Sequence, residues 1–381
     1  MPSKYLKLAF VGGATNSAVG YAHFVASRMD RCWELVAGAF STHQDVNRQA
    51  GRLYGVEEAR VYQNLEELLS REARNLDAIT ILTPTPLHAR MAIRCLEAGV
   101  PVICEKSLAM TSQEAREVEA VRAAKKGFLA VIYNYSGYPM VRELRRMVRA
   151  GDLGNLLHFQ VEMPQEGYLR TDSSGQKPVV QGWRLTDGPV PVIHLDLGVH
   201  LHELLDYLTG LEPTEVVAEQ SSRGWFGVVD QVTCLCRYTG NLTGQVWFSK
   251  TALGHRNGLR IRLYGSKGSA EWFQGSPEEL IFCLADGRRQ VFDRGMGLSV
   301  ASASRYTRFK AGHPAGFIEA LGNLYVDIHQ SLLKFQASGL QESQEVFGTS
   351  LAICGLEWLE AIARSCAKGN WQKLKTPEKI R

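Results

Sequence analysis

Short apolar segments alternate with helical segments through the first third of the chain, and this alternation is what most limits its possible folds. The expected strands are Leu6–Val11, Glu34–Phe40, Ala78–Leu82, Val100–Cys104 and Phe128–Tyr133. The expected helices are a segment that ends at Met29, then Asp45–Tyr54, Leu65–Glu72, Leu87–Ala98 and Ser112–Lys126. Because strands that alternate with helices through short connections form parallel sheets, the pattern predicts a doubly wound α/β domain.

The loop after the first strand, GGATNSAVGYAHF, has the composition of a dinucleotide-binding turn. Backbone N–H groups at such a helix N-terminus can bind a pyrophosphate. The Gly-x-Gly-x-x-Gly spacing is absent, since Ala14 stands at the second glycine and Gly20 comes two residues late. Asn16 is able to take the left-handed conformation that the turn needs. A nucleotide site with Gly12, Gly13 and Asn16 as contacts and an ordinary tight turn both stay open.

Polar side chains directly follow three of the expected strands. Ligands of doubly wound sheets bind beyond the carboxyl ends of the strands, so these loops are candidate contacts. A charged pair after a buried strand is unusual for a simple connector, and indicates either a cofactor or catalytic role or a local ion pair. The loops are Thr83-Pro84-Thr85-Pro86-Leu87-His88, Glu105-Lys106-Ser107 and Asn134-Tyr135.

The end of the second strand bears on the choice of cofactor. An acidic residue there would bind the adenine ribose diol of NAD, and the segment Ala39–His43 contains none. The hydroxyls of Ser41 and Thr42, with Arg48 nearby, would tolerate a 2′-phosphate. NAD and NADP are therefore both retained as cofactors.

The segment His194–Gly210 has the apolar spacing of an α-helix. Its leucines fall on one flank, whereas Asp196 and His200, one turn apart, fall on another. The pair is either the polar side of a surface helix or an acid and an imidazole held on a rigid element for chemistry. A metal cluster with His194 and His202 is disfavoured, because the helix directs these two side chains away from the Asp196 face.

After this helix the apolar pattern changes to period two, which predicts strands, and short turns between them indicate an antiparallel meander. The expected strands of the second half are Leu156–Met163, Thr214–Ser221, Asp230–Tyr238, Leu242–Lys250, Leu259–Tyr264, Ala270–Phe273 and Glu279–Leu284. The expected helices are Met140–Ala150, Ala315–Gln336 and Glu342–Ala367.

Two domains follow from these patterns. Residues 1–134 form a dinucleotide-binding domain, and residues 135–381 form an α+β domain for substrate binding and oligomerisation, with a large open, mainly antiparallel sheet. The closing helices of the second domain are able to pack back on the first. Because an open sheet leaves one face uncovered, we expect a homodimer or homotetramer through this sheet.

An unpatterned segment, Pro164–Ile193, precedes the helix that carries Asp196. Long loops in compact domains are usually functional or disordered. Within it, Tyr168, Trp183 and Arg184 are candidate sugar or cofactor contacts, and the alternative is that the aromatic side chains fill a surface groove.

Composition excludes several classes of partner. The 381 residues carry a formal net charge of only +4 and no long Lys/Arg run, which does not suggest nucleic-acid or anionic-membrane binding. No apolar stretch reaches the ~20 residues of a membrane span. MPSKYLKLAF does not resemble a signal peptide, so a cytoplasmic protein is expected. The eight scattered cysteines favour buried free thiols over a disulfide framework.

Taken in order, the first turn, TPTPLH, CEKS, DLGVH, RLYGSKGSAEW and the closing helices resemble the Gfo/Idh/MocA oxidoreductases, the glucose–fructose oxidoreductase and inositol dehydrogenase group. The resemblance runs over most of the chain. It implies an N-terminal Rossmann domain and an NAD(P)-dependent enzyme. The implied reaction is hydride transfer between nicotinamide and a secondary hydroxyl of a cyclic polyol, namely a sugar, glycoside, inositol or nucleotide sugar.

The resemblance also implies roles for residues. Lys106 would contact the reacting hydroxyl and the nicotinamide, His200 would accept the proton, and Asp196 would modulate both. These three would also contact the substrate, with Trp183, Arg184 and His313 as stacking and hydrogen-bonding groups. The residues implied to line the nicotinamide and ribose are Thr83, Pro84, His88, Glu105, Lys106 and Asn134.

Two departures from the family pattern stand out. Ser107 replaces a proline that often follows a cis bond, and because a non-proline cis bond costs about 3 kcal/mol, a trans bond is expected at Lys106–Ser107. The second glycine of the turn is also missing. Two other functions are therefore kept: a redox-silent protein that binds nucleotide and sugar, and an oxidoreductase whose permanently bound cofactor cycles between two substrates.

Overall fold

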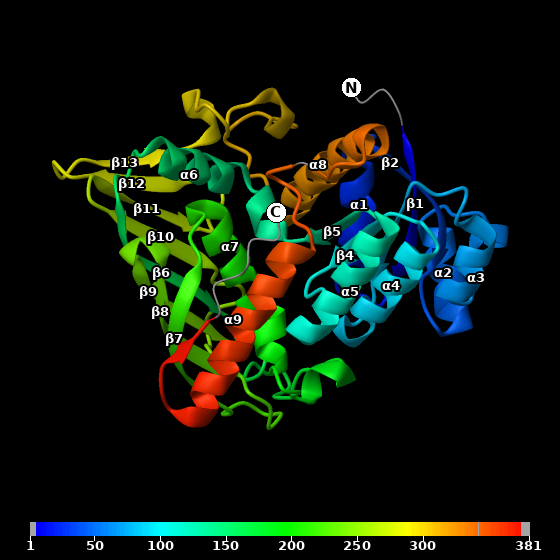
Figure 1. The fold of residues 1–381 in the computed structure, drawn as a ribbon, viewed down its shortest axis with the longest axis horizontal. Coiled ribbons are helices and arrows are strands. Elements are labelled where there is room, and N and C mark those ends of the chain that lie inside the picture. Colours follow the sequence, from blue (N-terminus) through cyan, green and yellow to red (C-terminus); the bar gives the residue numbers. More distant parts are fainter. Residues whose placement is uncertain (1–4, 342, 375–381) are drawn as a thin grey trace. The chain divides into compact units, whose positions relative to one another are not determined.

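The computed structural model describes residues 5–341 and 343–374, which fall into two compact units (Figure 1). Unit 1 comprises Met1–Gly137 and Phe317–Ile353, and unit 2 comprises Tyr138–Gly316 and Cys354–Arg381. A late segment of the sequence thus completes the N-terminal unit. No helix in the described ranges is both long and apolar enough to cross a membrane.

Unit 1 contains a five-stranded parallel sheet, which confirms the predicted doubly wound α/β fold. Its strands lie in the order β2-β1-β3-β4-β5. The strand order reverses between β1 and β3, and a reversal of this kind opens a crevice at the carboxyl ends of the strands. The strands are β1 (Leu6–Gly12), β2 (Trp33–Ala39), β3 (Ala78–Leu82), β4 (Val102–Glu105) and β5 (Leu129–Ile132).

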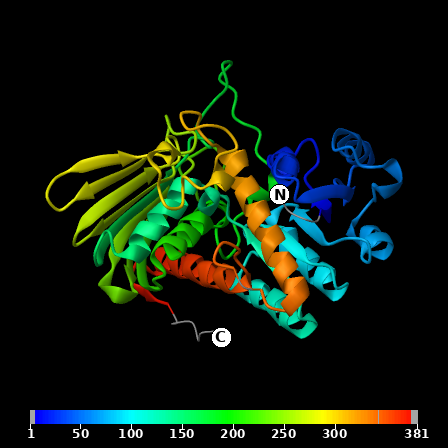
Figure 2. The ribbon, with the colours of Figure 1, turned by 90° about the horizontal axis from the view of Figure 1, so that it is seen from above.

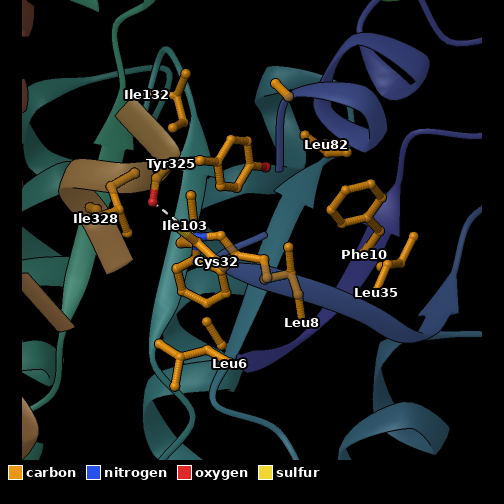
Figure 3. Packing of buried hydrophobic residues seen from close by; sticks show 14 of the residues in the cluster. Leu6, Leu8, Phe10, Cys32, Leu35, Leu82, Ile103, Ile132, Tyr325 and Ile328 are labelled. Atoms are coloured by element: carbon orange, nitrogen blue, oxygen red, sulfur yellow. Dashed lines mark hydrogen bonds between the residues drawn. The ribbon is translucent and has the colours of Figure 1, made fainter. Parts of the chain in front are cut away.

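The helices of unit 1 are α1 (Gly20–Met29), α2 (Gln44–Leu53), α3 (Leu65–Glu72), α4 (His88–Glu97), α5 (Ser112–Lys125) and α8 (Phe317–Ser338). Local sequence explains where several begin: Asn64 and Thr111 each accept a hydrogen bond from the backbone N–H three residues on. From α8, Tyr325 and Ile328 pack with Leu8 of β1 in one buried cluster (Figure 3). Burying each such aliphatic side chain stabilises the unit by about 1.5–3 kcal/mol.

Unit 2 is built on a nine-stranded sheet in the order β13-β12-β11-β10-β6-β9-β8-β7-β14. One face is buried beneath α6 (Pro139–Ala150), α7 (Val199–Thr209) and the part of α9 (Thr349–Lys368) from Cys354 on (Figures 1 and 2). The strands are β6 (Leu156–Pro164), β7 (Pro213–Ser221), β8 (Gln231–Tyr238), β9 (Thr243–Ser249), β10 (Arg260–Gly265), β11 (Gly268–Phe273), β12 (Leu280–Leu284), β13 (Arg289–Phe292) and β14 (Gln372–Lys373).

The sheet of unit 2 corrects the predicted meander in two ways. β6 inserts between β9 and β10 and pairs with β9 in parallel, because a strand that precedes the meander in sequence can enter it in either direction. The edge strands β13 and β14 were not predicted, since β13 is largely exposed and polar and β14 has two residues.

The predicted helix Glu342–Ala367 begins too early. Residue 342 lies outside the described residues, but α9 starts only at Thr349. The preceding segment pairs with the edge of β5, where the Val131 N–H donates to the Phe347 carbonyl at 2.8 Å. The Gln341 amide also donates to the Leu129 carbonyl at 2.8 Å. Tertiary pairing therefore overrides the helical pattern here.

All eight cysteines are free thiols, and five of them are buried. Burial raises the pKa of Cys95 to about 12, so this thiol is protonated and unreactive at neutral pH.

Candidate active site

The turn between β1 and α1 depends on three glycines. Gly12 and Gly13 have positive φ angles of 80° and 76°, and a Cβ on Gly12 would lie 2.8 Å from the backbone of Leu82. A Cβ on Gly20 would overlap the carbonyl of Gly13, so this glycine lets α1 begin directly against the strand end. Asn16 does not use the left-handed conformation open to it, because Gly12 and Gly13 supply the positive φ angles of the turn. The turn is a lengthened form of the glycine motif.

The loops after β3 and β4 are joined by His88, the first residue of α4. Its Nε2 lies 2.6 Å from the Thr83 carbonyl oxygen, and its Nδ1 lies 2.7 Å from the Ser107 carbonyl oxygen. Burial is the main cause that lowers the pKa of this imidazole. Pro84, beside Thr83, is exposed. His88 therefore holds two strand-end loops at a fixed spacing.

Glu105 and Lys106 stand at the end of β4. The Glu105 carboxylate accepts a hydrogen bond from His23 Nε2 at 2.8 Å and one from the Lys106 backbone N–H at 3.1 Å. Burial acts to raise the pKa of Glu105, but the His23 hydrogen bond and the neighbouring cations hold it below its usual value. The carboxyl is therefore ionised at neutral pH. The expected trans bond at Lys106–Ser107 is wrong: this bond is cis, in a turn whose two residues are held by Glu105 and His88.

Two buried polar groups at these strand ends have no protein partner among the described residues. They are the Ser107 hydroxyl and the side-chain amide of Asn134, which is 4% exposed at the end of β5. Buried polar groups are normally hydrogen-bonded, and each unsatisfied one needs an explanation. Together with the glycine turn, these groups fit a bound dinucleotide at the carboxyl ends of the strands.

The loop after β2 is held by Asn47. Its buried amide oxygen accepts from the backbone N–H groups of Phe40 and Ser41, at 2.7 and 3.3 Å. Thr42 and Arg48 are exposed beside it. The loop after β2 therefore presents hydroxyls and a guanidinium, and no carboxylate within Ala39–His43.

In unit 2 the predicted continuous α-helix is wrong in its first turn. His194–Gly198 form a π-helical turn, and α7 follows from Val199. The surface-helix alternative is also excluded, because Glu203 and Tyr207 are buried. Gly198, the last residue of this turn, packs closely on both sides: a Cβ there would lie 2.8 Å from a Leu359 methyl group and 3.1 Å from the Phe248 ring.

Asp196, in the π turn, is held by two cations. Lys250 donates a hydrogen bond to its carboxylate, and Arg184 forms an ion pair with the same oxygen. The Lys250 ammonium lies 4.9 Å from the centre of the Tyr168 ring, and the Tyr168 hydroxyl donates to the Arg184 carbonyl at 3.4 Å. His200 follows Asp196 by four residues and is 7% exposed. The predicted residues Tyr168, Arg184 and Asp196 are thus brought together.

Lys250 is the member of this cluster that the sequence reasoning missed. It was placed inside a strand, but β9 ends at Ser249 and Lys250 follows it, 6% exposed. A charged side chain directly after a buried strand is a signal related to the Glu105-Lys106 pair, and it could have identified Lys250 too.

The other predicted contacts lie around this cluster or apart from it. The Arg184 guanidinium stacks 4.4 Å over the Trp183 ring. His313 is exposed, its ring packs on Phe309 at 4.6 Å, and its carbonyl accepts from Arg294. These contacts give His313 no link to Asp196.

His194 and His202 are buried, and burial lowers the pKa of each to about 4. Their rings pack at right angles to Phe248 and at a tilt to Trp358, respectively. Over the ranges that the structure describes, no three His, Cys, Asp or Glu side chains are arranged to hold a metal ion.

Known proteins match this chain along nearly its whole length. A model for an oxidoreductase family with an NAD-binding Rossmann fold, GFO/IDH/MocA, matches residues 6–134, and a model for the GFO/IDH/MocA C-terminal domain matches residues 141–271. The uncharacterized oxidoreductase YfiI of Bacillus subtilis is 30% identical over 98% of both chains. Levoglucosan dehydrogenase of Pseudarthrobacter phenanthrenivorans is 25% identical over 78% of this chain and 80% of its own.

The fold of this chain is also similar to that of a solved structure. It is an inositol dehydrogenase homolog from Azotobacter vinelandii, complexed with NADH and myo-inositol. It is 28% identical, with a TM-score of 0.87 over 97% of this chain and 98% of that chain.

Proposed function

Because this chain belongs to the Gfo/Idh/MocA oxidoreductases, with an NAD-binding Rossmann domain, we propose that it is an NAD(P)-dependent dehydrogenase that oxidises a secondary hydroxyl of a cyclic polyol. The observation that carries the proposal is the ion-paired Asp196, one turn before His200 on a buried helix. Relatives named for inositol and levoglucosan support a cyclic polyol as the substrate class.

Each of the three proposed catalytic residues has one role. Nicotinamide, when bound, supplies the acceptor for the hydride. His200 accepts the hydroxyl proton, for which an imidazole is suited near neutral pH. Lys106 places an ammonium beside the oxygen and stabilises the developing alkoxide charge. Asp196, held in place by Lys250 and Arg184, stabilises the imidazolium that forms on His200.

The remaining predicted residues are proposed to bind and orient. Those proposed for the cofactor are Gly12, Gly13, Asn16, Ser41, Thr42, Arg48, Thr83, Pro84, His88, Glu105, Lys106 and Asn134. Those proposed for the substrate, besides the catalytic three, are Tyr168, Trp183, Arg184 and His313. His88 acts indirectly in this proposal, since both of its ring nitrogens already face backbone carbonyls.

A panel of inositols, sugars and glycosides with NAD and NADP tests the function. We expect cofactor reduction with at least one cyclic polyol, and a primary kinetic isotope effect when its carbinol hydrogen is deuterated and chemistry limits the rate. Reduced-nicotinamide absorbance in the purified protein would instead indicate a permanently bound cofactor. Nucleotide binding with no turnover on any member of the panel would indicate a redox-silent binding protein.

Arg48 is expected to contact the 2′-phosphate of NADP and so to lower KM for NADP. Replacing it by alanine should raise KM for NADP by about 1.5- to 5-fold, as the loss of one exposed charge contact predicts, and leave KM for NAD unchanged. Initial-rate kinetics with both cofactors measure this. Arg52, in the last turn of α2, is the matched control, and equal effects of Arg48→Ala on both cofactors would contradict the assignment.

We also propose that a second copy covers the exposed face of the unit 2 sheet, giving a homodimer or homotetramer. Along β8 one face is buried, while Thr233, Leu235 and Arg237 are exposed on the other. Leu235 is 47% exposed, so Leu235→Glu should shift light scattering toward the monomer. Val179→Glu, on an exposed loop, is the control. A wild-type protein that is monomeric at micromolar concentration would contradict the proposal.

A further inference from the structure

A line of buried hydrogen bonds in unit 1 ends on the backbone of Lys106. His23 of α1 stands in the middle: its Nδ1 lies 2.8 Å from the Tyr325 hydroxyl of α8, and its Nε2 lies 2.8 Å from Oε1 of Glu105. Oε2 of the same carboxylate accepts from the Lys106 N–H at 3.1 Å. His23 and Tyr325 are each 1% exposed. Three elements distant in sequence therefore converge on one residue of the lysine turn.

The chemistry of the groups fixes the direction of each bond. An ionised carboxylate can only accept, so His23 donates through Nε2–H to Glu105. In the neutral form of the ring, Nδ1 is then the acceptor for the Tyr325 hydroxyl. That hydroxyl also lies 3.5 Å from Thr80 Oγ1, and Figure 3 shows Tyr325 in the buried layer with Ile103 of β4.

The same helix also forms the start of the proposed cofactor site. His23 lies in the first turn of α1, three residues after Gly20, and Gly20 abuts the Gly13 carbonyl of the glycine turn. The residues of one helical turn move together, because their backbone hydrogen bonds hold them in one rigid segment. A shift of α1 on filling of the glycine turn therefore reaches Glu105 through the imidazole.

We propose that His23 is a positioning residue: through Glu105 it fixes the backbone of Lys106, and through α1 it couples the dinucleotide turn to that lysine. This inference rests on the proposed function, since it assumes that Lys106 acts on the substrate. Tyr325 is a second positioning residue, because its hydroxyl is hydrogen-bonded to Nδ1 of His23.

Steady-state kinetics of three variants give the first test. We expect His23→Leu to lower kcat about 10- to 100-fold, the size of a small misplacement of a catalytic group. His23→Gln, which can still donate to Glu105, should recover much of this loss. Tyr325→Phe should give a smaller decrease, and it keeps the experiment decisive if His23→Leu does not fold.

A matched control separates positioning from stability. Tyr62 is a buried tyrosine whose hydroxyl donates to Glu72 at 2.8 Å, away from the lysine turn. Tyr62→Phe loses a comparable hydrogen bond, so it should lower Tm while kcat of the folded protein stays at the parental value. A purely structural role of His23 would produce the same result in His23→Leu.

Hydrogen exchange at the Lys106 amide, with NADH as the probe, gives a readout that needs no turnover. In the parent, NADH should slow exchange both at the glycine turn and at Lys106. In His23→Leu, the Lys106 amide should exchange faster and no longer respond, while the glycine turn still does. Parental exchange at Lys106 and parental kcat in both His23→Leu and Tyr325→Phe would overturn the inference. A parent that binds NADH but oxidises no polyol would instead refute the proposed function, and the exchange result would still decide the coupling.

Discussion

The His200→Ala variant is expected to lose about 10²- to 10⁴-fold in kcat, the range that a positioned general base contributes. His200 lies one turn after Asp196, on the buried helix α7, and is itself buried. Water therefore has little access to the position of its imidazole. Without the imidazole, the hydroxyl proton must leave to water. KM for the cofactor should change little. Stopped-flow or steady-state kinetics at saturating cofactor measure the loss.

His202 provides the matched control on the same helix. It is also a buried histidine, its ring packs 5.6 Å from Trp358, and burial lowers its pKa to about 4. His202→Ala should destabilise the protein by about 1–3 kcal/mol, as loss of a buried ring does, while kcat of the folded protein is retained. Equal losses of kcat in the two variants would mean that helix packing, not base catalysis, explains His200.

A pH profile adds an independent readout. Because only a neutral imidazole can accept the hydroxyl proton, kcat/KM of the parent should fall toward acid pH if His200 is the base. The acid limb should be absent from the residual activity of His200→Ala. An unchanged acid limb in that variant would assign the titration to another group.

The strands of unit 1 were predictable because each is buried on both faces and bounded by turn residues. Ala78–Leu82 was placed without error for this reason. Candidate residues could be read off the strand ends, since Glu105 and Lys106 interrupt an apolar pattern.

What could not be predicted depends on contacts between distant segments. Phe347 pairs with β5 instead of extending a helix, and β6 joins β9 in parallel, because partners far away in sequence provide the hydrogen bonds. The same applies to His23, which looked like an ordinary helix residue until α8 placed Tyr325 beside it. The pairing of Lys250 with Asp196 is likewise set by the sheet.

Lys106→Met is expected to lower kcat by about 10²- to 10³-fold, comparable to the removal of one group that stabilises a developing oxyanion. Methionine keeps an unbranched chain of similar length but removes the charge and the three N–H donors. The alkoxide formed as the proton leaves would then lack its cation. The backbone N–H that donates to Glu105 is retained, so the turn itself should persist. Lys125→Met, on the exposed last turn of α5, is the control and should leave kcat unchanged.

Binding and chemistry can be separated in the same variant. NADH titration should show affinity in Lys106→Met close to that of the parent if the lysine acts chiefly on the reacting oxygen, whereas a large loss of affinity with preserved kcat would assign it to cofactor binding instead. Lys106→Arg sharpens the distinction: its charge is kept, but the planar guanidinium cannot replace a compact ammonium beside one oxygen. We therefore expect Lys106→Arg to bind NADH normally and to recover only part of kcat. Full recovery of kcat would show that a positive charge suffices and that the position of the ammonium does not matter.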